Sequence, residues 1–137
     1  MVRVMRRIYQ GWFVLVSAAL VVQLYLAGYG VFAFKGLGPF DAHRALGDLI
    51  GIAILLGIGG AFAARVPWRL TVLNIALFVL MLVQASLAYA GIQAVAAFHV
   101  VNGVLIFLGA LYLTWEAVRL PMPESAPVAT AAAATTP

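Results

Sequence analysis

The chain has 137 residues, of which 66% are apolar and 9% are charged, and it contains no cysteine. An ordinary soluble domain has roughly 25% charged and 45–50% apolar residues, so this composition does not cover a water-facing globule. The absence of cysteine excludes a disulfide framework, a zinc ribbon, an iron–sulfur cluster and a thiolate nucleophile. The basic residues behind the net charge of +4 are explained as membrane anchors. They form no basic stripe of the kind that binds nucleic acid.

Four stretches of the sequence have the roughly 20 apolar residues that a helix needs to cross about 30 Å of hydrocarbon. They predict transmembrane spans at residues 12–34, 45–64, 70–90 and 94–115. Because the connections are short, we expect residues 1–120 to form one all-α, up-down four-helix bundle in the membrane. The Pro-, Ala- and Thr-rich residues 121–137 predict a disordered cytoplasmic tail.

The basic residues predict how the bundle is oriented, because loops rich in Lys and Arg stay on the cytoplasmic side. Two residues, Lys35 and Arg44, belong to one side of the predicted bundle. The other side has six, namely Arg3, Arg6, Arg7, Arg65, Arg69 and Arg119, together with all three tryptophans, Trp12, Trp68 and Trp115. We therefore expect a multi-pass protein with both termini in the cytoplasm.

A weak internal repeat relates the two halves of the chain. Gln23, His43 and Gly47 of the first half correspond to Gln84, His99 and Gly103 of the second. The repeat predicts two tandem helical hairpins related by a pseudo-two-fold axis along the membrane normal. The chain has only these two histidines, and the repeat places both at a similar depth near the outer leaflet.

The paired histidines suggest one haem b, because its iron takes two neutral imidazoles on opposite faces of the porphyrin. Residues i and i+4 share a helix face, so Gly47 and Gly103 lie one turn from His43 and His99 and leave space for a flat macrocycle. The structural alternative is that these glycines only let membrane helices pack closely.

Three charged residues near His43 have candidate roles. Lys35 and Arg44 would supply positive charge for the haem propionates at the outer mouth. Asp48 is the one acidic residue well inside a predicted span. Since a carboxylate there is costly, we expect Asp48 to be protonated, paired with Arg44 or part of a proton path.

The remaining polar residues of the spans have both structural and ligand-binding interpretations. Gln23, Gln84 and Asn102 are expected to hydrogen-bond between helices, and alternatively to orient an imidazole or hold a quinone head group. Tyr25 and Tyr29 share a helix face and are candidates to line the outer cavity, or to anchor the helix at the membrane interface.

Three motifs carry a family resemblance: Q-x3-AG-x-G-x-F at residues 23–32, HR-x2-G at residues 43–47 and H-x2-N at residues 99–102. On these residues the chain resembles an uncharacterised bacterial family of small four-helix membrane proteins, over about residues 10–118. The resemblance implies the same fold and a bacterial inner membrane, and it implies no activity. More loosely, the histidine and glycine pairs resemble those of four-helix transmembrane b-type cytochromes, and two histidines rather than four imply at most one haem.

The sequence therefore predicts a membrane cytochrome that holds one haem b and exchanges single electrons with quinol or an extracytoplasmic partner. No catalytic residue is assigned, and whether the chain is an enzyme stays open, an electron-transfer protein or an oxidoreductase component being the interpretations that fit a haem. One alternative is a non-catalytic accessory or assembly subunit of a larger membrane complex, or a homo-oligomer packed through small residues. A weaker alternative is a small-molecule or proton-handling protein built around Asp48 and the histidines.

Overall fold

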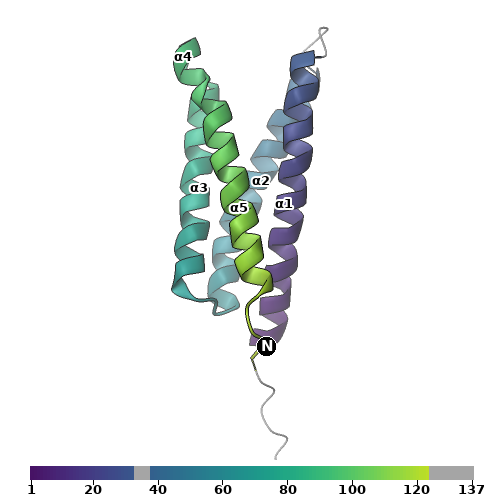
Figure 1. Cartoon of the computed structure of the whole chain (residues 1–137), viewed down its shortest axis with the longest axis vertical. Helices are drawn as coiled ribbons and strands as arrows, with labels where there is room; N and C mark the ends of the chain where they lie inside the picture. The colour runs from purple at the N-terminus through teal and green to yellow at the C-terminus, as the bar shows by residue number, and fades with distance from the viewer. Residues whose placement is uncertain (33–37, 124–137) are drawn as a thin grey trace, which may run out of the picture.

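The computed structural model describes residues 1–32 and 38–123. Within them the chain forms four long helices, α1 (Val2–Phe32), α2 (Gly38–Ala63), α3 (Trp68–Ala88) and α5 (Phe98–Val118), with a single-turn helix α4 (Gln93–Ala96) before α5 (Figure 1). Each of α1, α2 and α3, and the segment formed by α4 and α5, is long and apolar enough to cross a membrane. The predicted all-α, four-helix membrane fold is confirmed, whereas Lys35 and the tail from residue 124 onward lie outside the described residues.

The four long helices form a square in which sequential helices are antiparallel neighbours. The hairpin α1/α2 packs beside the hairpin α3/α5 through α2 with α3 and α1 with α5, which leaves α2 and α5 on one diagonal. We call the end with Arg6, Arg65 and Arg69 the basic end, and the end with His43 and His99 the histidine end. The ribbons of the two hairpins lie close together at the basic end and diverge toward the histidine end (Figure 1).

The first two helices begin earlier than the predicted spans. The helix α1 starts at Val2 instead of residue 12, because the good helix formers Arg3, Met5, Arg6, Arg7 and Gln10 continue the helix beyond the apolar stretch. The helix α2 starts at Gly38 instead of residue 45, and Asp41 lies in its first turn, where a carboxylate interacts favourably with the helix dipole. The apolar stretch of a sequence corresponds to the part of a helix that lipid surrounds. The whole helix can therefore be longer than the span predicted from it.

The last span is interrupted, although the sequence predicts one continuous helix over residues 94–115. At Ala97 the hydrogen-bond pattern tightens, since the amide of Val100 donates to the carbonyl of Ala97 three residues earlier. The short α4 therefore precedes α5, and His99 becomes the second residue of α5. The turn before α4 contains Gly91 with a φ of 67°, a conformation that suits glycine.

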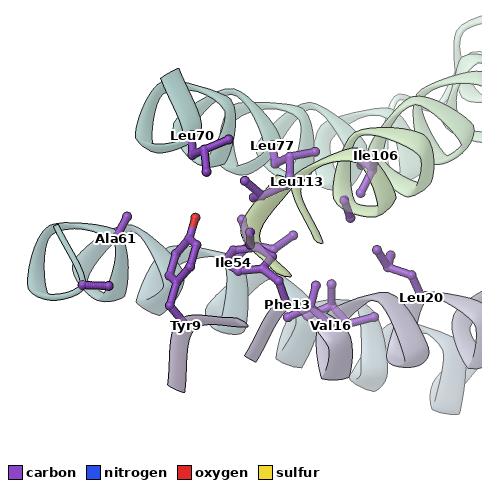
Figure 2. Packing of buried hydrophobic residues seen from close by; sticks show 14 of the residues in the cluster. Tyr9, Phe13, Val16, Leu20, Ile54, Ala61, Leu70, Leu77, Ile106 and Leu113 are labelled. Carbon is purple, nitrogen blue, oxygen red and sulfur yellow. The ribbon is translucent and has the colours of Figure 1, made fainter. Parts of the chain in front are cut away.

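The core lies along the bundle axis, as Figure 2 shows for part of it. Tyr9 and Phe13 of α1 meet Ile54 of α2, Leu77 of α3 and Leu113 of α5, and all five side chains are almost completely buried. Large apolar side chains also cover the outer faces of the helices, where a soluble protein would present charges. This arrangement, apolar both inside and outside, is what a lipid bilayer around the bundle requires.

The basic end is closed by contacts between chain segments that are distant in sequence. The guanidinium group of Arg6 donates to the carbonyls of Pro121 and Arg65, and Arg65 has a φ of 49°, in the left-handed region. Arg69 forms an ion pair of 2.7 Å with Glu116 across α3 and α5. The contact of Arg6 with Pro121 and a hydrogen bond of 3.0 Å from the Gln10 amide to the carbonyl of Ala117 hold the two hairpins together at this end, whereas the Arg69–Glu116 pair stabilises the second hairpin internally.

We expect Gly57→Ala to destabilise the bundle and Gly59→Ala to leave it unchanged or slightly more stable. A Cβ atom at Gly57 would lie 2.7 Å from the Phe13 ring and 3.0 Å from the Asn74 amide, whereas one at Gly59 would have nothing within 4 Å. Overpacking of this kind costs about 1–3 kcal/mol. Thermal unfolding of both variants in the same detergent measures the difference, and equal melting temperatures would contradict the packing described.

Candidate functional site

The two histidine side chains meet across the diagonal of the bundle. His43 comes from the start of α2 and His99 from the start of α5, two helices that make no close backbone approach in the described residues. Their ring centroids are 6.2 Å apart and their planes are inclined by 60°. The sequence repeat had placed them at matching depth, and the fold brings them together.

A backbone carbonyl of the preceding helix orients each imidazole ring. The Nδ1 atom of His43 lies 3.2 Å from the carbonyl oxygen of Gln23, and the Nδ1 atom of His99 lies 3.1 Å from that of Gln84. Since a carbonyl oxygen only accepts hydrogen bonds, both Nδ1 atoms carry the proton. Neutral rings of this tautomer have their lone pair on Nε2, which is the arrangement that metal-bound histidines use.

The glutamine side chains of the two halves also occupy matching places. A Cβ atom at Gly47 would lie 3.0 Å from Nε2 of Gln23, and one at Gly103 would lie 3.2 Å from Nε2 of Gln84. The two glycines thus give each glutamine amide room to lie against the facing helix. The space beside each glycine, which was expected to receive a flat macrocycle, is therefore occupied by a glutamine amide in this structure.

The second half has one polar contact that the first half lacks. The Nδ2 group of the buried Asn102 donates to Oε1 of Gln84 at 2.7 Å and to the carbonyl of Leu80 at 2.9 Å. The interhelical role expected for Gln84 and Asn102 is therefore present. In the first half, Nε2 of Gln23 donates to the carbonyl of His43 at 2.7 Å, and lies 3.4 Å from Nε2 of its ring.

Arg44 and Asp48, the charged residues near His43, are exposed on the outside of the bundle. Arg44 forms a loose ion pair of 3.5 Å with Asp41, one turn before it, and among the described residues no ion pair joins it to Asp48. The pairing of Arg44 with Asp48 that the i, i+4 spacing suggested is replaced by this i, i+3 contact. The propionate role proposed for Lys35 falls outside the described residues.

The two tyrosines of α1 share a face, as their spacing predicts. The rings of Tyr25 and Tyr29 stack with centroids 6.1 Å apart, and more than half of each side chain is exposed. They lie on the outward side of α1, where interfacial anchoring is the simpler explanation of the two that the sequence left open.

Some polar features of the bundle are not apparent from the sequence patterns. The hydroxyl of Ser17 contacts that of Thr114 at 2.8 Å, and Thr114 donates to the carbonyl of Phe13, so these residues connect α1 to α5. The hydroxyl of Tyr9 and the amide of Asn74 are buried without hydrogen bonds among the described residues. The sequence signal that could have identified these buried polar positions is a hydroxyl or amide residue at helical spacing within an otherwise apolar stretch.

The histidine pair is too small a ligand set for an ion held by protein alone. The described residues contain no group of three or more His, Cys, Asp or Glu side chains that could hold a metal ion. Structural zinc, for comparison, takes four protein ligands. Two imidazoles with their lone pairs on Nε2, of which that of His43 lies 3.4 Å from the Gln23 amide nitrogen, instead suit a group that supplies the other ligands of its metal.

Fold and site together define a small four-helix membrane protein with an internally repeated glutamine–histidine–glycine arrangement. The chain belongs to a family described as a family of unknown function (DUF6220), whose model matches residues 23–91. That match includes the first histidine set and Gln84, and ends before His99. No curated protein and no solved structure matches the chain.

We expect Asn102→Leu to lower the stability of the bundle, since it removes two hydrogen bonds and leaves Oε1 of Gln84 without its donor. Interhelical hydrogen bonds in membranes are worth about 0.6–2 kcal/mol, which sets the expected loss. The exposed neighbour Val101, changed to leucine, is the matched control. An Asn102→Leu protein that melts at the wild-type temperature would show that the contact contributes nothing.

Proposed function

We propose that this protein is a membrane b-type cytochrome that binds one haem through His43 and His99. The observation that supports the proposal is the histidine pair itself, with centroids 6.2 Å apart and both Nδ1 atoms bound to backbone carbonyls. Two imidazoles on opposite faces of one iron, with iron–nitrogen bonds of about 2 Å, have centroids about 6.3 Å apart. The separation and the tautomer both fit this ligand set.

The roles of the protein residues follow from their contacts. The carbonyls of Gln23 and Gln84 fix the tautomer and the direction of the two rings, and a hydrogen bond of this kind makes the Nε2 atoms better donors to a metal. Both rings are half-buried between apolar helices, which lowers the dielectric constant around the site. When bound, haem supplies reversible one-electron chemistry, and its potential depends on axial ligands, hydrogen bonding and burial.

We further propose that the basic end faces the cytoplasm of a bacterial cell, which places the histidine end at the outer side of the inner membrane. Arg6, Arg65, Arg69 and Arg119 support this orientation by the tendency of basic loops to remain inside. Trp115 adds an interfacial anchor, with the guanidinium group of Arg119 3.5 Å above its ring. A single haem near the outer side suits exchange with quinol or an extracytoplasmic partner.

A second candidate is an accessory subunit that packs against a larger membrane complex. It is favoured by glycines on outer faces of the helices, because Cβ atoms at Gly11 and Gly59 would meet nothing within 4 Å. Small exposed residues let another membrane helix approach closely. The two candidates differ in whether the isolated protein carries a chromophore.

The protein purified from haem-sufficient cells is expected to be red, with about one haem per chain and a Soret band that sharpens on reduction. His43→Ala and His99→Ala should each abolish the bis-histidine spectrum, because each removes one axial ligand. Gln93→Ala, at the same end and exposed, is the control that keeps it. A colourless wild-type protein would reject the cytochrome proposal and favour the accessory subunit.

The orientation is testable with introduced cysteines, since the chain has none of its own. A membrane-impermeant maleimide added to spheroplasts should label Gln93→Cys at the histidine end. It should label Arg3→Cys at the basic end only after the membrane is permeabilised. The reverse pattern would invert the proposed topology.

A further inference from the structure

The two halves of the repeat differ in how their glutamine amides are satisfied. In the second half, Oε1 of Gln84 accepts a hydrogen bond from Asn102, three residues after His99. In the first half, the residue three positions after His43 is Leu46, which has no polar group. Accordingly, Oε1 of Gln23 is buried and has no hydrogen-bond partner among the described residues.

The orientation of the Gln23 amide is fixed by its surroundings. Its Nε2 group donates to the carbonyl of His43 at 2.7 Å, and exchanging the nitrogen and oxygen atoms would place two acceptors against each other. The unpaired atom is therefore the oxygen, which requires a hydrogen-bond donor. Among the described residues no protein group supplies that donor.

An apolar groove on the lipid-facing side of α1 and α2 ends one helical turn from Gln23, at Ala19. The groove has a volume of about 180 Å³, and Trp12 and Ala53 line it together with Ala19 and Leu46. Trp12 donates to the carbonyl of Ala53 at 2.9 Å, which fixes the indole between the two helices. Ala19 lies one turn before Gln23 on α1, and an apolar cavity of about 150 Å³ is enough to bind benzene.

We propose that Oε1 of Gln23 accepts a hydrogen bond from a ring hydroxyl of an isoprenoid quinol, whose tail lies in the groove between α1 and α2. This inference rests on the proposed electron-transfer function and specifies its substrate. The quinol is a hydroxyl donor, whereas the corresponding quinone offers only carbonyl acceptors, so Gln23 distinguishes the two redox forms. Since Gln84 is already satisfied by Asn102, only the first half of the repeat receives the quinol.

The test compares the binding of decylubiquinol and decylubiquinone to the full chain in nanodiscs under anaerobic conditions. Trp68→Phe and Trp115→Phe leave Trp12, in the groove, as the fluorescence reporter in every protein compared. This reference protein should bind the quinol about tenfold more tightly than the quinone, the size of one neutral hydrogen bond. Leu46→Asn, which imitates Asn102, should bring that ratio close to one, and Leu46→Met is the matched control that should keep it.

A second variant covers the case in which Leu46→Asn does not fold. Gln23→Met removes the acceptor and retains a similar volume, and it should also bring the quinol-to-quinone preference close to one. An unchanged preference in the variants, or no quinol binding at all, would overturn the proposal. Equal binding of both forms by the reference protein, with a higher melting temperature for Leu46→Asn, would mean that a water molecule is the only donor to Gln23.

Haem content, read from the Soret band, separates this inference from the proposed function. A protein that contains haem but does not prefer quinol retains the cytochrome function and loses the Gln23 assignment. A colourless protein that prefers quinol retains the hydroxyl acceptor and loses the cytochrome function.

Discussion

A polar group inside a membrane bundle has to find its partner within the protein, because the surrounding hydrocarbon offers none. This constraint accounts for most of what distinguishes the histidine end. Each imidazole is held by a carbonyl of the neighbouring helix, and each glutamine amide lies in the space left by a glycine. Among the described residues the constraint is not met at Oε1 of Gln23, nor at Tyr9 and Asn74 in the core, and the first of these is the position for which we propose a ligand.

The two halves of the internal repeat share the same geometry around their histidines and differ in the residue three positions after each histidine. Both hairpins position a histidine by the same backbone contact, so the two rings approach each other across the pseudo-two-fold axis with equivalent tautomers. The exchange of Asn102 for Leu46 at the corresponding position alters only the glutamine beside each ring. Two similar halves can therefore hold one shared group while they differ in what else they bind.

The sequence was sufficient to predict the number of spans, their antiparallel order and the matching depth of His43 and His99, because all of these follow from hydrophobic length and spacing. It did not predict that Gln23 and Gln84 act on the histidines through their backbone carbonyls, since a carbonyl has no residue-type signature. The i, i+4 spacing of Arg44 and Asp48 suggested a pair, but exposed arginine side chains are long and Asp41 is equally near. Sequence spacing identifies the residues within reach of an arginine on a helix, but it does not determine which of two such residues forms the ion pair.

The diagonal placement of the histidines has a mechanical consequence for the whole bundle. The two hairpins are joined at the basic end by Arg6, which donates to the carbonyl of Pro121, and by Gln10, which donates to that of Ala117, and they diverge toward the opposite end (Figure 1). A group bound by both His43 and His99 would link the two hairpins at the end where they diverge. Its binding free energy adds to the stability of the closed bundle, so assembly of the site and completion of folding become a single step.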